Sequence, residues 1–419
     1  MGVSRTVRSS TGLVVAALIA LSLSASAARL PRHQDRAHGH KSQHSPPPII
    51  PLERIHVFGN RPAPFALEAR AAELVAMRSG IVLYAYREHE RMQPASLAKM
   101  MTFYLVLEAL AQNRITLETE MPVSEAAWRL SLNDSVSRMF LQVGQKVAVR
   151  DLLYGLMVSS GNDAAVVLSE YLGGSTTAFA DQMNKKAREL GLGETHFTNP
   201  DGLPTPGEYT TAADMVKLGR AIIERFPGAL QYTAAKEFTF DKIRQRNFNT
   251  LLFYDSRVNG LKTGHVEEAG YHLVASARTE NLELVAAVFG THSMEKRRVE
   301  TDKLLEWAFR SFVTISPDWH KAVPSSIRVY EGDIETVPVA PLGGRAYFTV
   351  DKGLENKVTL RAELSKSPLI APVVRGASVG QLTVMIAGKP QSSAPIVTQV
   401  AIRRGGFFHN IADSIRMRL

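Results

Sequence analysis

Residues 94–112, which read PASLAKMMTFYLVLEALAQ, decide the fold of this chain. Apolar residues fall on nearly every side of a helix that begins near Ser96, a pattern typical of a helix buried in a core. Ser96 and Lys99 are three residues apart, so their side chains share one face of this helix and the amine can reach the hydroxyl. Burial lowers the pKa of a lysine, and a neutral lysine can activate a serine nucleophile. The stretch therefore predicts a core helix that carries a reactive serine at its start.

Periodic patterns on both sides of this helix predict a domain that mixes helices with a sheet. We expect a β-hairpin over residues 72–77 and 81–86. Three more strands are expected at residues 258–263, 271–277 and 282–289. Helical patterns recur at residues 151–171, 178–190, 211–225 and 297–312. We place this α+β domain, with a mostly antiparallel sheet and many helices, at residues 63–314.

Beyond residue 315 the pattern changes to short alternating runs separated by turn residues. The runs lie at residues 326–330, 337–339, 346–350, 358–364, 381–386 and 396–402. Short strands at such spacing are typical of an all-β sandwich or barrel. We therefore expect a small all-β domain at residues 315–404.

The N-terminal residues predict export. Arg5 and Arg8 precede an apolar run and then the small residues 25–28, which together indicate a signal peptide at residues 1–28. A retained N-terminal anchor is the alternative, although the apolar run is short for a membrane span. Residues 29–62 contain many His, Gln, Ser and Pro, and we expect a flexible linker there.

The last residues, 405–419, predict a basic amphipathic helix. Phe408, Ile411, Ala412, Ile415 and Leu419 fall on one helical stripe, with arginines off it. We expect this helix to contact a membrane surface. The alternative is a helix docked on its own β domain.

The composition excludes several classes of protein. The formal net charge is +9, but no nucleic-acid-binding helix motif, zinc-ligand spacing or aromatic RNA-binding motif accompanies it, so we expect no nucleic-acid partner. The positive charge suits an anionic membrane surface and a cell wall. The absence of cysteine excludes disulfides and thiolate metal sites. Four histidines in the linker, at residues 33, 38, 40 and 44, are interpreted as solvated, with a loosely bound metal as the alternative, and we expect neither a metal at the site nor a cofactor.

Three short motifs carry the candidate chemistry, in the order SLAK at residues 96–99, SGN at residues 160–162 and KTG at residues 262–264. The chain also contains decoys, because SMEK at residues 293–296 matches the first pattern and SLN at residues 131–133 matches the second. Order, spacing and local context favour the first set. Ser96 follows a proline at the start of a buried helix, where the helix dipole favours developing negative charge.

The second motif lies in a turn between two helical stretches, from which polar side chains can point into a cleft. We expect Ser160 to relay a proton to the leaving amine, and Asn162 to hold the substrate amide and Lys99. The alternative is an ordinary turn in which Asn162 or Asp163 caps a helix. Lys262 is the nearby cation expected to help lower the pKa of Lys99.

The third motif ends a predicted strand. Gly264 lets a substrate lie against the strand edge as an added strand, and Lys262 with Thr263 can bind a terminal carboxylate. The backbone N–H groups of Ser96 and His265 would form an oxyanion hole. His265 is expected to act through its position and not as an acid or base.

With these motifs in place, the chain after the linker resembles the low-molecular-weight penicillin-binding proteins of the D-alanyl-D-alanine carboxypeptidase family. The matching segments are residues 94–102, 142–145, 195–203, 247–252, 258–265 and 269–271. The resemblance implies a penicillin-recognising, β-lactamase/transpeptidase-like catalytic domain, a β-rich second domain and a tail that attaches the enzyme to a membrane.

The resemblance also implies a mechanism. Ser96, deprotonated by Lys99, attacks the carbonyl between two D-alanines of a peptidoglycan stem peptide, the last D-alanine leaves, and water hydrolyses the acyl-enzyme. β-Lactams would acylate the same serine. Arg297 resembles the family's arginine that helps to bind the terminal carboxylate. Asn259 stands where the family pattern predicts an acidic residue. The expected location is the periplasm, at the outer face of the inner membrane.

Three alternatives stay open at this stage. A class A β-lactamase would need a deacylating glutamate in an E-x-x-L-N segment, and no such segment lies between Asn162 and Lys262. A non-catalytic cell-wall-binding protein of the same fold would not need all three motifs intact. A D,D-endopeptidase uses the same residues and differs in the shape of its cleft.

Overall fold

The computed structural model of the chain describes residues 52–59, 62–365 and 367–406. The expected signal peptide, most of the expected linker and nearly all of the expected C-terminal helix therefore lie outside the described residues. In the part that is described, no helix is both long and apolar enough to cross a membrane.

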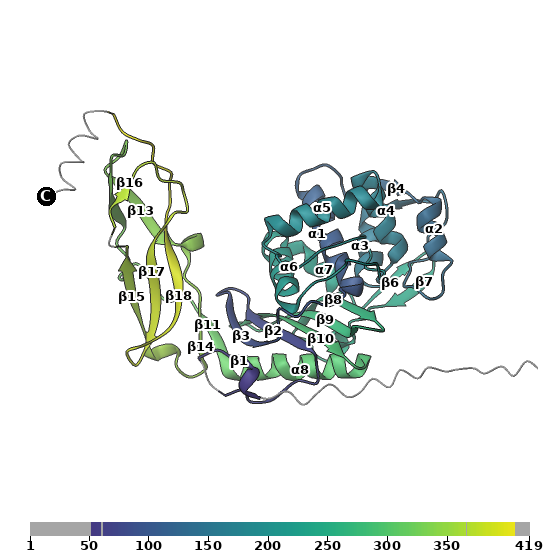
Figure 1. Cartoon of the computed structure of the whole chain (residues 1–419), viewed down its shortest axis with the longest axis horizontal. Coiled ribbons are helices and arrows are strands. Elements are labelled where there is room, and N and C mark those ends of the chain that lie inside the picture. Colours follow the sequence, from purple (N-terminus) through teal and green to yellow (C-terminus); the bar gives the residue numbers. More distant parts are fainter. Residues whose placement is uncertain (1–51, 60–61, 366, 407–419) are drawn as a thin grey trace, which may run out of the picture. The chain divides into compact units, whose positions relative to one another are not determined.

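A six-stranded sheet forms the centre of the first domain (Figure 1). Its strands lie in the order β1 (His56–Val57), β3 (Ile81–Tyr86), β2 (Ala71–Ala76), β10 (Glu283–Thr291), β9 (Gly270–Arg278) and β8 (Val258–Val266). All five pairings are antiparallel, which confirms the expected sheet. β8 is an edge strand, so one of its sides is open to pairing with another segment.

Both faces of this sheet are covered, because alternate residues of each central strand are buried on opposite sides. In β10, Leu284 packs with the helix α8 (Met294–Ser311), whereas Val285 packs with the helices of the other face. Figure 1 shows α8 on one side of the sheet and the remaining helices on the other. These helices are α1 (Lys99–Ala111), α2 (Glu125–Ser131), α3 (Val149–Met157), α4 (Asn162–Gly173), α5 (Thr176–Glu189), α6 (Ala212–Arg225) and α7 (Leu230–Thr233).

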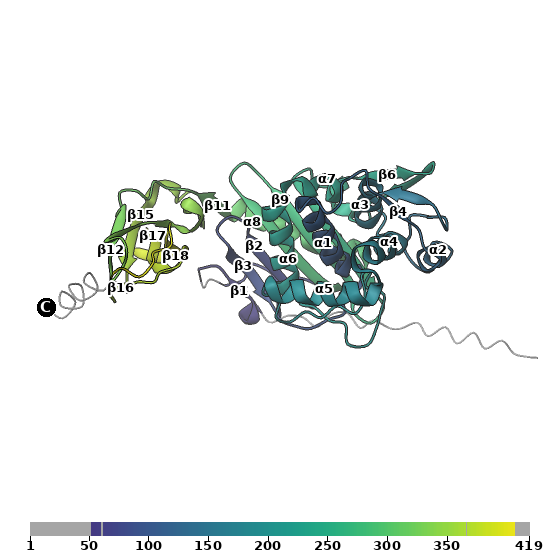
Figure 2. The ribbon, with the colours of Figure 1, turned by 90° about the horizontal axis from the view of Figure 1, so that it is seen from above.

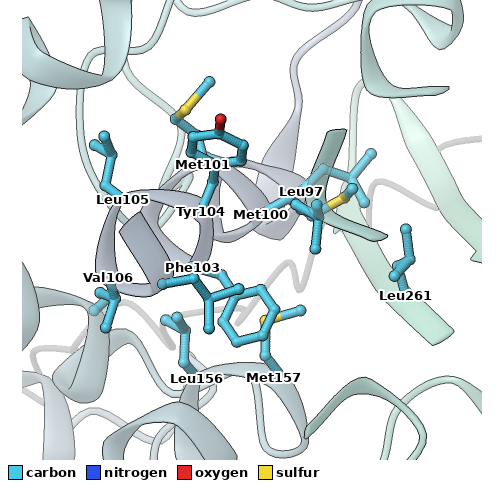
Figure 3. Packing of buried hydrophobic residues seen from close by; sticks show 14 of the residues in the cluster. Leu97, Met100, Met101, Phe103, Tyr104, Leu105, Val106, Leu156, Met157 and Leu261 are labelled. Carbon is cyan, nitrogen blue, oxygen red and sulfur yellow. The ribbon is translucent and has the colours of Figure 1, made fainter. Parts of the chain in front are cut away.

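The helix α1 lies at the centre of the larger apolar cluster, as the sequence predicts. Seen from above, it lies among the neighbouring helices (Figure 2). Phe103 and Val106 are fully buried and lie near Leu156 and Met157 of α3 (Figure 3). The expected helix over residues 96–112 differs at its start, because residues Ala95–Ala98 form a 3-10 turn, η2, before α1 begins at Lys99.

Several short elements have no strong sequence pattern. They are the paired strands β4 (Glu120–Pro122) and β5 (Lys146–Ala148), the hairpin β6 (Glu237–Phe240) and β7 (Ile243–Arg246), and the 3-10 turns η1 (Leu52–Arg54), η3 (Pro227–Ala229) and η4 (Thr250–Phe253). The end of the expected linker is also ordered, since β1 pairs with β3. Ile55, Val57 and Phe58 are buried there, which explains why the chain is folded before residue 63.

The second domain is all-β, as predicted. Its larger sheet has the order β15 (Val358–Leu364), β17 (Ser378–Ile386), β18 (Lys389–Thr398), β13 (Thr336–Pro341), β12 (Ser326–Tyr330) and β16 (Leu369–Ile370). A second sheet pairs β11 (Phe312–Ile315) with β14 (Phe348–Asp351), and the turns η5 (Leu342–Gly344) and η6 (Glu355–Lys357) flank β14. Side chains from both sheets, including Phe348 and Leu382, share one buried apolar cluster.

Candidate active site

Ser96 and Lys99 lie on one face of the η2–α1 junction. Lys99 Nζ is 3.1 Å from Ser96 Oγ, and it also donates a hydrogen bond to the backbone carbonyl of Asp201. Lys99 is completely buried. Burial lowers the pKa of Lys99 to about 8, although the nearby carboxylates of Asp201, Asp163 and Glu208 oppose this shift. The amine is therefore poised to exchange a proton with the serine near neutral pH.

Ser160 and Lys262 form a second hydroxyl–amine pair. Lys262 Nζ donates hydrogen bonds to Ser160 Oγ at 2.9 Å and to the Thr263 carbonyl at 3.1 Å. Ser160 has a φ of +56°, in the left-handed region, and α4 begins two residues later at Asn162. This backbone turn directs the serine hydroxyl toward β8. The structure thus brings the second and third sequence motifs into direct contact.

Asn162 is the first residue of α4 and lines the same cleft. It is buried, and within the described part of the chain its Oδ1 atom makes no hydrogen bond. A buried amide oxygen without a partner is costly unless a ligand supplies a donor. The alternative prediction that Asn162 or Asp163 caps this helix is not what the structure shows, because Gly161 occupies the N-cap position.

Burial and mutual repulsion together set the electrostatics of the two lysines. Burial is the main cause that lowers the pKa of Lys99. The pKa of Lys262 is lowered well below its usual value, first by burial and then by the positive charges of Lys99 and Arg297. Repulsion between two ammonium groups is mutual, so protonation of either lysine disfavours protonation of the other.

The KTG residues lie within β8 and not at its end, since this strand continues to Val266. Thr263 and Gly264 line the cleft at the open edge of the sheet. A Cβ atom on Gly264 would lie 2.8 Å from the Pro94 carbonyl oxygen, so a side chain there would displace the segment that carries Ser96. Glycine at this position allows the strand and the segment of Ser96 to approach closely.

Arg297, in the first turn of α8, reaches the far end of the cleft. It is 3% exposed, and its guanidinium donates to the carbonyls of Phe248 at 3.1 Å and His272 at 3.4 Å. Burial lowers its pKa to about 10. His265 lies nearby on β8, and its ring stacks on Tyr271 with 3.9 Å between centroids.

These residues surround one cleft of about 300 Å³. Every candidate site residue except Lys99 and Lys262 lines the cleft. Lys99 donates a hydrogen bond to Ser96 and Lys262 donates one to Ser160, and both serines line the cleft. The lining consists of Ser96, Ser135, Val136, Ser137, Ser160, Asn162, Asp201, Gly202, Leu203, Pro204, Phe248, Thr263, Gly264, His265, Val266, Tyr271, Met294 and Arg297. This arrangement can bind an extended chain that ends in a carboxylate and present a carbonyl to Ser96.

Both decoy motifs have structural roles. Ser293 is the N-cap of α8, where its hydroxyl accepts a hydrogen bond from the Lys296 backbone N–H. Ser131 donates to the buried carboxylate of Asp163 at 2.7 Å. Neither serine lines the cleft. Ser96, in contrast, lines the cleft.

Asn259, which stands where an acidic residue was expected, has hydrogen-bond partners for both its side chain and its backbone carbonyl. Its Oδ1 atom accepts a hydrogen bond from Ser276 at 2.6 Å, and its carbonyl accepts one from Thr233 at 2.9 Å. The neutral amide therefore still ties β8 to its surroundings.

Sequence reasoning gave no role to Asp201, which the structure brings next to Lys99. Asp201 holds Lys99 through its backbone carbonyl, and its side chain accepts a hydrogen bond from the Leu203 N–H. Gly202 follows with a φ of +77°, and a Cβ atom there would lie 1.8 Å from the Ala95 carbonyl oxygen. The only sequence signal for this contact was the Asn-Pro-Asp-Gly-Leu segment at residues 199–203, which does not reveal a backbone contact.

The chain is similar to known proteins over most of its length. A family model described as D-alanyl-D-alanine carboxypeptidase matches residues 58–293, and one described as the C-terminal domain of penicillin-binding protein 5 matches residues 316–404. The chain is 38% identical to D-alanyl-D-alanine carboxypeptidase DacA of Haemophilus influenzae, over 84% of this chain and 89% of that protein. It is 37% identical to DacC of Escherichia coli over the same shares. Crystal structures of penicillin-binding protein 5 from Haemophilus influenzae superpose with a TM-score of 0.74 at 38% identity, covering 82% of this chain and 99% of that one.

Proposed function

This chain belongs to the D-alanyl-D-alanine carboxypeptidase family, and we propose that Ser96 is the nucleophile with which it cleaves its substrate. The enzyme is a serine-type D-alanyl-D-alanine carboxypeptidase of the penicillin-binding class, with a cell-wall function. The substrate is a peptidoglycan stem pentapeptide that ends in D-Ala-D-Ala. The observation that carries the proposal is the 3.1 Å separation between Lys99 Nζ and Ser96 Oγ at the cleft.

Acylation begins with the neutral form of Lys99, which accepts the proton of Ser96 Oγ as this oxygen attacks the carbonyl between the two D-alanines. A pKa of about 8 leaves roughly a tenth of the lysines neutral at pH 7. The backbone N–H groups of Ser96 and His265 donate to the developing oxyanion. The terminal carboxylate binds to Thr263, Lys262 and Arg297.

The leaving amine needs a proton, and Ser160 relays one to it: Ser160 gives its hydroxyl proton to the amine and takes up the proton that Lys99 accepted from Ser96, so that Lys99 is neutral again. Because Lys262 donates a hydrogen bond to Ser160 Oγ, the hydroxyl hydrogen of Ser160 is free to point toward the leaving nitrogen. Asn162 holds the substrate amide with its unpartnered carboxamide oxygen. After D-alanine leaves, Lys99 activates a water molecule that hydrolyses the acyl-enzyme, so Ser96 is regenerated.

The location of the enzyme follows from its two ends. The residues 1–28 would export the chain, and the basic, apolar-striped residues 405–419 would attach it to the outer face of the inner membrane. Flotation of the full chain with anionic vesicles tests the attachment. Deletion of residues 407–419 should abolish flotation, and flotation that survives the deletion would contradict this anchor.

Labelling with a fluorescent penicillin tests the nucleophile. The wild-type chain should become covalently labelled on a denaturing gel, and Ser96→Ala should not. Ser293→Ala is a matched control, because Ser293 belongs to the decoy motif and should label like the wild type. Equal labelling of Ser96→Ala and the wild type would refute the assignment.

A further inference from the structure

Two large apolar side chains are exposed at the end of the cleft that carries Arg297. Phe248 is 41% exposed and Met294 is 44% exposed, and both line the cleft. Exposed apolar surface in a concave site is a characteristic of ligand pockets, because a bound ligand removes that surface from water. Neither side chain takes part in the acyl transfer proposed for this site.

Both side chains flank the guanidinium that binds the terminal carboxylate. The backbone carbonyl of Phe248 accepts a hydrogen bond from Arg297 at 3.1 Å, which fixes residue 248 beside the guanidinium. Met294 precedes Arg297 by three residues on α8, so the two side chains share one face of that helix. The side chain of a terminal residue branches from the carbon next to its carboxylate. A carboxylate held at Arg297 therefore places that side chain within reach of both apolar groups.

We infer that Phe248 and Met294 form an apolar subsite for the side chain of the substrate's last residue, so that the enzyme accepts terminal D-residues with apolar side chains larger than a methyl group. The inference rests on the proposed function, because it takes Arg297 as the group that binds the terminal carboxylate.

The charges around the subsite exclude a cationic terminal side chain. Arg297 is itself positively charged, and its neighbour Arg298 lies 4.1 Å from the ring of Tyr254. The nearest acidic residue on α8, Glu295, is already paired with Arg298 at 2.6 Å. A terminal D-lysine would bring a second positive charge next to that of Arg297 and would lose hydration against Phe248. D-Methionine has a similar length and no charge, so it is the matched apolar probe.

The size of the effect follows from buried area. Each fully buried methylene strengthens binding about fourfold, and the subsite covers only part of the added group, so D-methionine should lower KM by about five- to tenfold relative to D-alanine. The last residue departs when the acyl-enzyme forms. Peptides that differ only in that residue therefore give the same acyl-enzyme, which must be hydrolysed at the same rate.

The test compares three peptides that end in D-Ala-D-Ala, D-Ala-D-Met and D-Ala-D-Lys, with release of the last residue as the readout. The wild-type enzyme should show the lower KM for D-methionine and a weakened kcat/KM for D-lysine. The double variant Phe248→Ser, Met294→Ser should lose the advantage of D-methionine. Val299→Ser is the control, since Val299 is a partly exposed apolar residue of α8 that does not line the cleft.

Distinct outcomes separate this inference from the function on which it rests. Cleavage of the D-alanine peptide with no advantage for D-methionine would overturn the subsite alone. An advantage that survives in the double variant would overturn it as well. If none of the peptides is cleaved, the proposed function fails and the subsite fails with it. Melting temperatures of all variants identify any that have not folded.

Discussion

The charge-conserving substitution Lys99→Arg tests the proposed general base most sharply. A guanidinium stays protonated throughout the accessible pH range, so the variant keeps a cation near Ser96 but has no group that can accept its proton. Removing a general base costs about 10² to 10⁴ in rate. We expect acylation by a fluorescent penicillin to slow by that factor.

The pH dependence of the wild-type enzyme supplies the second half of this prediction. Lys99 must be neutral to act, and its pKa of about 8 means that the neutral fraction falls from one half at pH 8 to about one hundredth at pH 6. The second-order acylation rate should therefore fall about 50-fold between pH 8 and pH 6. The acylation rate falls toward low pH because a general base loses its activity when it becomes protonated.

Stopped-flow measurement of acylation from pH 5.5 to 9.5 checks both statements. The wild-type rate should rise with pH and level off above pH 8, while the residual rate of Lys99→Arg should be flat over the acid limb. A wild-type rate that does not change between pH 6 and pH 8 would refute the reasoning. So would a Lys99→Arg enzyme that acylates at the wild-type rate.

Three further predictions concern a glycine of the cleft, a buried carboxyl group of the sheet and a helix cap. Gly264→Ala should slow acylation at least tenfold and destabilise the fold by about 1–3 kcal/mol, since its methyl group would press on the Pro94 carbonyl; wild-type labelling and melting would contradict this. Burial raises the pKa of Glu73 to about 7, so folding stability should fall by roughly 2–4 kcal/mol as pH rises from about 4.5 to above 7, and Glu73→Gln should remove that loss in urea titrations at several pH values. A Glu73→Gln enzyme with an unchanged pH profile of stability would count against it. Ser293→Ala should cost about 1 kcal/mol through loss of the α8 cap, measured by urea unfolding, and unchanged stability would contradict the capping role.

Long, regular elements of the fold could be predicted from sequence, and short ones could not. The hairpin of β2 and β3 and the helix α1 have long, mostly apolar sequences, because each buries many apolar side chains. β16 and β1 have two residues each, which is too short for any period to appear. β1 forms because its pairing with β3 stabilises it. The sequence just before β1 is rich in His and Pro, so composition alone predicts a linker there.

In the candidate site, too, some residues could be predicted from the sequence and others could not. Ser96, Ser160 and Thr263 could be predicted from motifs, because side-chain chemistry leaves a signature in the sequence. Asp201 could not, since its contribution to Lys99 is a backbone carbonyl that any residue possesses. The strong effect of burial on Lys262 also depends on how closely four segments approach one another, which only the folded chain reveals.

Mass spectrometry of the enzyme, acid-quenched within milliseconds during turnover of a peptide ending in D-Ala-D-Ala, tests the central claim most directly. The account predicts an adduct whose mass is that of the peptide without its last D-alanine, located by proteolysis on the fragment that contains Ser96. Release of D-alanine with no adduct, or an adduct on any other residue, would contradict it.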